Sequence, residues 1–206
     1  IGSDCIEGEL KAMSAFASTL SADLAPEILP PVTRTLDFTI AEERWRLSGS
    51  LTDLRPNGLV RYRYRPKTHW ACLPWWIEHL FLNACTPEVG TCLSVWHFTD
   101  KTLHIGPVKD AQALLSDLLK IYRRGLSQPL PFFPNTSWAF VESGGQMNKA
   151  REKWDTAYAG YEGESDDPYN RLAMRGNADP LAEEAFPDLA RRVFGALVTY
   201  CKGENA

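Results

Sequence analysis

Residues 47–65 read Leu47-Ser48-Gly49-Ser50-Leu51-Thr52-Asp53-Leu54-Arg55-Pro56-Asn57-Gly58-Leu59-Val60-Arg61-Tyr62-Arg63-Tyr64-Arg65, and no other part of the chain predicts its architecture so directly. Residues that favour strands stand on both sides of a Pro-Asn-Gly turn. Proline presets the turn and Asn-Gly tolerates a positive φ, so the pattern is typical of a β-hairpin. We therefore expect strands over 44–54 and 59–65, joined by a turn at 55–58.

The flanking sequence extends this hairpin into a mixed α/β half. A further strand at 35–40 would complete a three-strand meander, and apolar residues spaced by three and four predict a helix over 7–29 that prolines stop. Beyond the hairpin we expect the following elements: a helix at 74–84, strands at 92–98 and 102–105, and a helix at 109–124.

From residue 129 onward the pattern is helical, with expected helices at 137–143, 147–159, 181–184 and 188–201 and no strand pattern. The predicted fold class is thus α/β (α+β), a mixed sheet flanked by helices with a helical carboxyl-terminal half. We expect an α/β core over 1–128 and a helical extension over 129–206 that packs on it.

Three arginines alternate along the predicted strand 59–65. Side chains two residues apart share a face, so Arg61, Arg63 and Arg65 would lie about 6.6 Å apart in a row. The other face would hold Val60, Tyr62 and Tyr64. Such a row repels itself unless negative groups lie opposite it. Three interpretations stay open: contacts to DNA phosphates, salt bridges to carboxylates of this chain or of another subunit, and a plain solvated face.

Charge and composition exclude several classes of protein. The net charge of −4 argues against a protein that coats nucleic acid nonspecifically, although residues 55–67 hold five bases and no acid. No apolar run approaches the roughly 20 residues of a membrane helix, and no signal peptide is recognisable. Five scattered cysteines, an odd number, favour free thiols in a reducing cytoplasm over disulfides or a metal–thiolate site. Because the chain begins at Ile1, we expect a fragment of a longer protein.

The order of the 47–65 segment is similar to the core of the PD-(D/E)xK nucleases, in which two strand acids hold Mg²⁺ and a lysine helps to activate water. In this alignment the first acid falls at Thr52 or Asp53, the second at Arg61 and the lysine at Arg63. An arginine cannot ligate a cation and would repel one. The resemblance therefore implies a nuclease-like fold with a vestigial site, no catalytic residue, no metal and no cofactor.

A longer resemblance is to the RecC family, the gamma subunits of bacterial exodeoxyribonuclease V. It rests on three stretches of sequence: 36–40 together with 47–51, Leu130-Pro131-Phe132-Phe133-Pro134-Asn135-Thr136-Ser137-Trp138-Ala139, and Asp167-Pro168-Tyr169-Asn170-Arg171-Leu172. The match spans nearly the whole chain and corresponds to the carboxyl-terminal, inactivated nuclease-like part of that subunit. It implies RecB-like helicase–nuclease and RecD-like helicase partners, double- and single-stranded DNA, and a pin that divides the duplex, for which the 44–67 meander is a candidate.

Tryptophans follow the basic run directly, and aromatics beside arginines are typical of channels for single-stranded DNA, although they also fill cores and interfaces. The candidate DNA-binding residues are Arg55, Arg61, Arg63, Arg65, Lys67, Trp75 and Trp76. We expect the histidines to be ordinary packing residues. The acidic segment 162–167 is read as a solvated loop, with Ca²⁺ binding and docking to a basic partner as alternatives.

Three hypotheses for the function follow. The first is a non-catalytic domain of a helicase–nuclease that steers or splits DNA strands and helps to assemble subunits during double-strand break repair. The second is an assembly domain that never touches DNA, with its arginines locked in salt bridges. The third is a working Mg²⁺ nuclease that uses Asp53, Glu42 or Glu43 and a further acid.

Overall fold

The computed structural model describes residues 2–85, 91–155 and 163–202, which divide into two compact units. The first unit contains residues up to 39 and residues 44–112, and the second contains residues 40–43 and those from 113 onward. The mixed α/β class is confirmed, because strands and helices alternate up to residue 105 and only helices follow. These two units do not test the folding boundary expected near residue 128, which stays a prediction.

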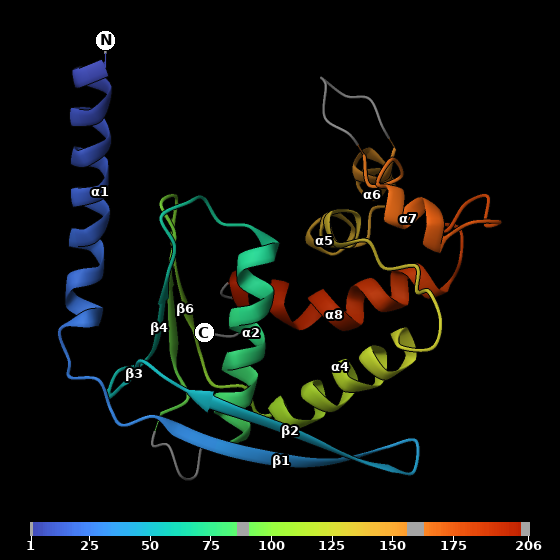
Figure 1. Cartoon of the computed structure of the whole chain (residues 1–206), viewed down its shortest axis with the longest axis horizontal. Coiled ribbons are helices and arrows are strands. Elements are labelled where there is room, and N and C mark those ends of the chain that lie inside the picture. The colour runs from blue at the N-terminus through green and yellow to red at the C-terminus, as the bar shows by residue number, and fades with distance from the viewer. Residues whose placement is uncertain (1, 86–90, 156–162, 203–206) are drawn as a thin grey trace. The chain divides into compact units, whose positions relative to one another are not determined.

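The first unit begins with α1 (Gly2–Leu24), the blue helix of Figure 1. It ends five residues before the expected end at 29, because Pro26 disfavours helical geometry in the residue before it. Its last turns pack on the sheet: Leu20 is buried, and Asp23 Oδ2 lies 3.0 Å from Nε2 of His97. The Phe16 ring packs on Tyr64 with ring centroids 5.5 Å apart.

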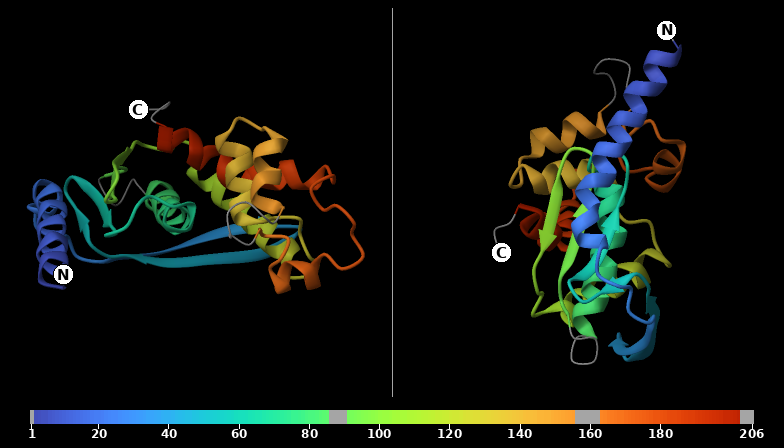
Figure 2. Two further views of the ribbon diagram at one scale, coloured as in Figure 1. Left: turned by 90° about the horizontal axis from the view of Figure 1, so that it is seen from above. Right: turned by 90° about the vertical axis from the view of Figure 1, so that its left-hand side faces the viewer.

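Strands β1 (Val32–Ile40) and β2 (Glu43–Leu51) form a two-stranded sheet of their own, which Figures 1 and 2 show as a long ribbon. Cross-strand hydroxyls bond on one face, with Thr35 Oγ1 and Ser48 Oγ 2.8 Å apart. The two residues of the turn, Ala41 and Glu42, both have positive φ (49° and 64°). That geometry matches the twist of the strands, although glycine or asparagine is more usual there.

The second sheet has the order β3-β4-β5-β6, formed by β3 (Leu54–Arg55), β4 (Gly58–Tyr62), β5 (Ser94–His97) and β6 (Thr102–Ile105). β3 and β4 are the hairpin that the Pro-Asn-Gly turn predicts, so that prediction is confirmed. The three-strand meander is wrong. The chain breaks at Asp53, whose φ is +58°, and β4 pairs with β5 in parallel instead of with β2.

Helix α2 (His69–Ala84) crosses from β4 to β5, which allows the two strands to pair in parallel. It begins five residues before the expected start, because Thr68 caps it and its Oγ1 accepts a hydrogen bond from the N–H of Ala71. Figures 1 and 2 show α1 and α2 on opposite sides of this sheet. The core under α2 contains the following buried residues: Leu51, Leu54, Leu59, Phe81, Leu82 and Cys85.

The second unit is helical, with α4 (Ala111–Gly125), α5 (Pro134–Glu142), α6 (Met147–Trp154), α7 (Pro168–Ala173) and α8 (Ala185–Lys202). Its core is built from Phe133, Phe140, Ala150, Leu181, Phe186 and Ala190. The short helix expected at 181–184 is wrong, because the chain makes turns there. The expected end of the 147–159 helix falls partly outside the described residues. No helix in the described segments combines the length and apolarity needed to cross a bilayer.

Candidate nucleic-acid interface

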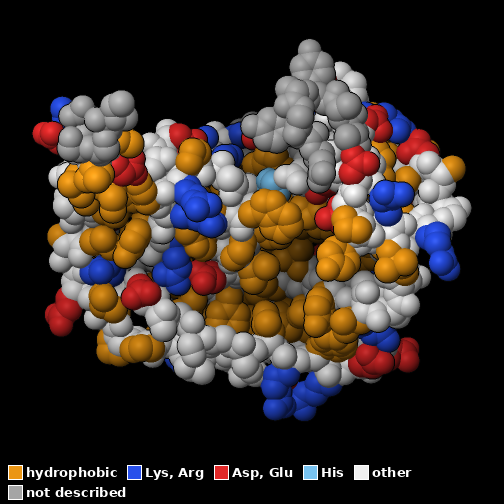
Figure 3. All heavy atoms as spheres, turned by 45° about the horizontal axis from the view of Figure 1, so that its top comes forward, with side chains coloured by type: hydrophobic (Ala, Val, Ile, Leu, Met, Phe, Trp, Pro, Cys, Tyr) orange, Lys and Arg blue, Asp and Glu red, His pale blue; other side chains and the backbone are white. Residues whose placement is uncertain are grey.

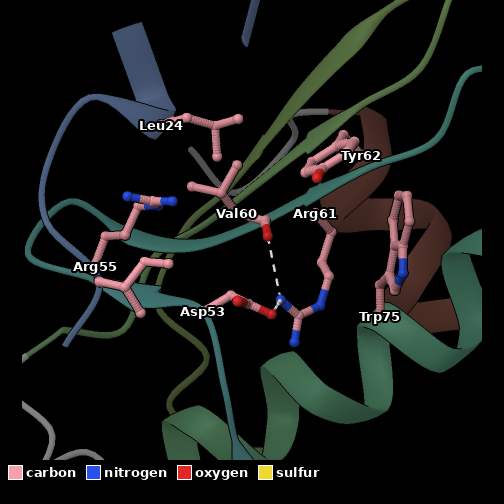
Figure 4. A pocket seen from close by; sticks show the side chains of 8 residues that line it. Leu24, Asp53, Arg55, Val60, Arg61, Tyr62 and Trp75 are labelled. Atoms are coloured by element: carbon pink, nitrogen blue, oxygen red, sulfur yellow. Dashed lines mark hydrogen bonds and ion pairs between the residues drawn. The ribbon is translucent and has the colours of Figure 1, made fainter. Parts of the chain in front are cut away.

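Arg61, on β4, is the centre of the candidate site. Its Nε donates to Glu78 Oε2 on α2 at 2.6 Å, and Nη1 donates to the backbone carbonyl of Val60 at 3.2 Å. Nη1 also lies 3.9 Å from Oδ2 of Asp53, a contact drawn in Figure 4. Only 16% of the Arg61 side chain is exposed. One guanidinium is therefore shared between carboxylates from two different segments of the chain.

Local backbone geometry brings these groups together. The chain bends between β2 and β3, where the positive φ of Asp53 turns the backbone and the Thr52 hydroxyl lies 3.3 Å from the Asp53 carboxylate. Helix α2 runs back beside β4 and supplies Glu78. The nuclease alignment had placed Asp53 and Arg61 in one site, and the structure brings them together. The alignment did not assign Glu78 a role, because that residue is 17 positions from Arg61 and no spacing rule connects the two.

The arrangement has electrostatic consequences for metal binding. A guanidinium has donors only and a fixed positive charge, so it fills the space between two carboxylates as a cation would. Within residues 2–85, 91–155 and 163–202, no cluster of three or more His, Cys, Asp or Glu side chains is placed to hold a metal ion. Asp53 and Glu78 therefore suit an ion pair with the Arg61 guanidinium better than coordination of a metal ion.

A pocket of about 490 Å³ opens beside Arg61 at the edge of the sheet (Figure 4). β3 pairs only with Gly58 and Leu59, so the rest of β4 lies at the edge. The Arg55 guanidinium donates to the Pro26 carbonyl, which holds that arginine against the end of α1. The lining residues are Leu24, Ile28, Asp53, Arg55, Val60, Arg61, Tyr62 and Trp75.

The row of three arginines predicted along one strand does not form, and that prediction is wrong. β4 ends at Tyr62, and a tight turn follows in which the N–H of Arg65 donates to the Arg63 carbonyl at 2.8 Å. Arg63 and Arg65 are exposed, and neither side chain has a hydrogen-bond or ion-pair partner among the described residues. Lys67 is half-buried, and its backbone N–H donates to Asp100. Figure 3 shows Lys and Arg side chains as small separate groups among hydrophobic ones on the face that it draws.

Comparison with known proteins places the chain in a family. The sequence model of the RecC C-terminal domain matches residues 1–145. The chain belongs to the RecC C-terminal domain family. It is similar to the RecBCD enzyme subunit RecC of Escherichia coli (strain K12), with 28% identity over 181 residues, which is 77% of this chain and 15% of that protein. The chain therefore spans a small part of the length of this relative.

The tryptophans of this RecC-family chain divide into core and surface. Trp76 is 1% exposed and stacks on His79, so it belongs to the core and cannot reach DNA, contrary to its inclusion among the candidates. Trp75 is half-buried and packs on Phe98, with ring centroids 5.0 Å apart. Among the described residues of the first unit, two aromatic residues outside the candidate set are exposed: Trp70 (57%), on the first turn of α2, and Tyr62 (56%), at the end of β4. Tyr62 is exposed because β4 ends at this residue, and no pattern in the sequence predicts that β4 ends there.

Two histidines of this RecC-family chain, His79 and His97, are buried packing residues, as expected, whereas His104 is exposed. His79 Nδ1 lies 2.7 Å from Ser94 Oγ, and its Nε2 lies 3.0 Å from the Gly106 carbonyl oxygen. Burial of this ring lowers the pKa of His79 to about 4, so the ring is neutral near pH 7. It ties α2 to β5 and to the segment after β6.

The acidic loop of this RecC-family chain has structural uses. The Glu164 carboxylate accepts hydrogen bonds from the backbone N–H groups of Asn135 (2.9 Å) and Thr136 (2.7 Å) at the start of α5. Asp167 caps α7 by accepting from the N–H groups of Tyr169 and Asn170. These two carboxylates are therefore occupied by helix caps, which favours neither Ca²⁺ binding nor a purely solvated loop. Glu162 lies outside the described residues.

Proposed function

We propose that this chain is a non-catalytic domain of a RecC-type subunit in a RecBCD-like helicase–nuclease, working in double-strand break repair and recombination in the cytoplasm. It would help to separate or steer DNA strands and to hold RecB-like helicase–nuclease and RecD-like helicase partners. Membership in the RecC family supports this assignment. The observation that carries the non-catalytic part is the Arg61 guanidinium between Glu78 and Asp53.

The chemistry of hydrolysis explains why Arg61 matters. Metal-dependent phosphodiester hydrolysis needs a cation that lowers the pKa of a bound water and polarises the phosphate. Arg61 supplies positive charge but cannot bind and ionise a water as a metal can, because all its nitrogen groups are donors. Its charge is also compensated by the Glu78 carboxylate at 2.6 Å. On this proposal the site holds its own side chains in place, and its carboxylates serve the Arg61 guanidinium instead of a metal that would activate a nucleophile.

Contact with DNA is assigned to the exposed arginines beyond β4. Arg63 and Arg65 come shortly after Tyr62, which lines the pocket. Their side chains have no partner among the described residues, so their guanidiniums are available to phosphate oxygens. Arg61 is excluded from this role because its charge is already paired. The net charge of −4 makes the proposed contact local rather than a general attraction of the whole domain.

The second candidate function is a subunit-assembly scaffold with no DNA contact. The Arg61–Glu78 pair favours it, since one of the three arginines is used to hold α2 on β4. The two candidates differ in what Arg63 and Arg65 do. In the scaffold they would bind carboxylates of a partner subunit, and in the DNA-handling domain they would bind phosphates.

Binding of labelled duplex and single-stranded DNA to the 206-residue chain at two salt concentrations tests the proposal. We expect binding that weakens with salt, and a smaller salt dependence in the Arg63→Ala/Arg65→Ala variant, with the slope of log K against log[salt] reduced by about 0.7–0.9 for each lost phosphate contact. The matched control is Arg171→Ala/Arg175→Ala, which removes the same charge from exposed positions near α7. Equal effects of the two variants would argue for the scaffold.

Incubation of linear DNA with the chain and Mg²⁺ or Mn²⁺ tests the non-catalytic part separately. We expect no cleavage above a protein-free control. Cleavage that disappears in Asp53→Ala would overturn the proposal and restore the nuclease hypothesis, in which Asp53 acts with Glu42 or Glu43.

A further inference from the structure

The pocket beside Arg61 has features that the proposed function leaves unused. We propose that it receives one unstacked base of single-stranded DNA while Arg63 and Arg65 bind the adjoining phosphates. This inference rests on the proposed contact with DNA and names the nucleic-acid form and the chemical group that the site takes.

The walls of the pocket suit a flat ring. Its volume of about 490 Å³ is within the range of small-ligand sites, and Tyr62 and Trp75 contribute aromatic side chains to one side of it (Figure 4). Trp75 is held by its packing on Phe98 and Trp96, at centroid distances of 5.0 and 6.0 Å. Leu24, Ile28 and Val60 add apolar surface. An aromatic wall that is already fixed loses little freedom when a base stacks on it.

The charges at the pocket select a neutral group over a phosphate. Arg55 and Arg61 are matched in number by Asp53 and Glu78, and Glu78 is within 2.6 Å of Arg61. A phosphate would meet the exposed carboxylate of Asp53, so its attraction to the guanidiniums would be offset. A base carries no charge, and its edge offers both donors and acceptors. Guanidinium N–H groups and carboxylate oxygens can satisfy such an edge.

The surroundings favour a single strand as the occupant. Arg63 is the next residue but one after Arg61 along the chain, and its exposed side chain and that of Arg65 have no partner among the described residues. A base that enters the pocket would thus bring its flanking phosphates toward free positive charge. In a duplex that base would first have to unpair and unstack, whereas a single strand presents it at little cost.

Abasic oligonucleotides separate base insertion from phosphate contact, because they keep the phosphates and lack the bases. We would measure, by fluorescence anisotropy, binding of the 206-residue chain to a fluorescein-labelled oligothymidylate and to its abasic counterpart of equal length. We expect about tenfold tighter binding of the base-containing strand, the size of effect that stacking of one base gives. Tyr62→Ala should remove this preference, and Tyr62→Phe should keep it.

Two controls make the outcomes separable. Tyr169→Ala removes an exposed tyrosine of α7 that is not among the residues lining the pocket, and should leave the preference intact. Arg63→Ala/Arg65→Ala should weaken binding of both strands by the same factor. Salt-dependent binding without any preference for bases would overturn the base pocket while the proposed DNA contact stands. No binding to either strand would overturn both. Loss of binding to a RecB-like subunit in Tyr62→Ala, with no base preference in the unmodified chain, would make the pocket a protein site and overturn the inference.

Discussion

The Arg61 guanidinium is mostly removed from water, and its 2.6 Å contact with Glu78 offsets the cost of burying that charge. Glu78→Gln keeps the size and one acceptor but removes the negative charge. We expect a loss of about 1–2 kcal/mol in the free energy of unfolding, less than for a fully buried pair because Glu78 is partly exposed. Urea denaturation followed by circular dichroism measures it.

An exposed ion pair of the same chain is the matched control for Glu78→Gln. Asp37 pairs with Arg44 at 3.2 Å on the β1–β2 ribbon, and both side chains are at least half exposed. Asp37→Asn should therefore lower the free energy of unfolding by clearly less than Glu78→Gln does, because water already screens an exposed pair. If the two substitutions cost the same, Arg61 gains nothing special from its position, and its assigned role as a paired cation is wrong.

His79 gives the chain a predicted dependence of stability on pH. Its pKa is about 4 in the folded chain, below the usual 6.5, so folding favours the neutral ring. The stabilisation is fully present above pH 6.5 and is lost as the pH falls from 6.5 toward 4, because over that range the unfolded chain binds the proton more readily than the folded chain does. The loss attributable to this group is about 3 kcal/mol over that window. Urea midpoints across the window should fall less in His79→Gln, and an equal fall in both chains would contradict the assignment.

Helix α5 depends at its start on a carboxylate from a distant loop. Pro134 begins the helix, and the N–H groups of Asn135 and Thr136 donate to Glu164, whose negative charge also favours that end of the helix. We expect Glu164→Ala to destabilise the chain by about 1–2 kcal/mol and to speed amide hydrogen exchange in α5 before other helices.

Glu184→Ala is the comparison for this cap, because Glu184 is an exposed acid of the same unit with no partner among the described residues. Its removal should change the free energy of unfolding by about 0.5 kcal/mol or less. Hydrogen exchange that speeds uniformly over the second unit, instead of first in α5, would show that Glu164 stabilises the unit as a whole and would contradict its role as a cap of α5.

The elements show how far the sequence could be read. Turn chemistry and helical periodicity act over a few residues, so the hairpin at Asn57-Gly58 and the helix α4 were predictable from them. The pairing of β4 with β5, 35 residues away at Leu59↔Ser94, depends on burial of both faces of β4 and leaves no local mark. The same distinction between local and long-range effects holds for the site. Asp53 and Arg61 were found by alignment, whereas Glu78 and Tyr62 could not be predicted, because their places depend on the packing of α2 and the length of β4.

The two units raise the question of where one folding unit ends. Sequence pattern placed the boundary near 128, at the proline-rich connector, while contacts group residues 113–125 of α4 with the later helices. A specific link supports the second grouping: Arg192 of α8 donates through Nε and Nη2 to the two carboxylate oxygens of Asp117 on α4, at 2.9 and 2.7 Å. A bidentate pair of this kind is both strong and geometrically selective.

Fragments test the boundary directly. We expect a fragment of residues 107–202 to unfold in one cooperative transition, and a fragment of residues 129–202 to be less stable by about 1–3 kcal/mol, because it leaves Arg192 without Asp117. Asp117→Asn in the longer fragment should lower its stability by part of that difference, which separates the contribution of the ion pair from that of the rest of α4. Thermal melts by circular dichroism measure all three. If the shorter fragment is as stable as the longer one, α4 belongs to the first folding unit, and the connector at 129–134 is the true boundary.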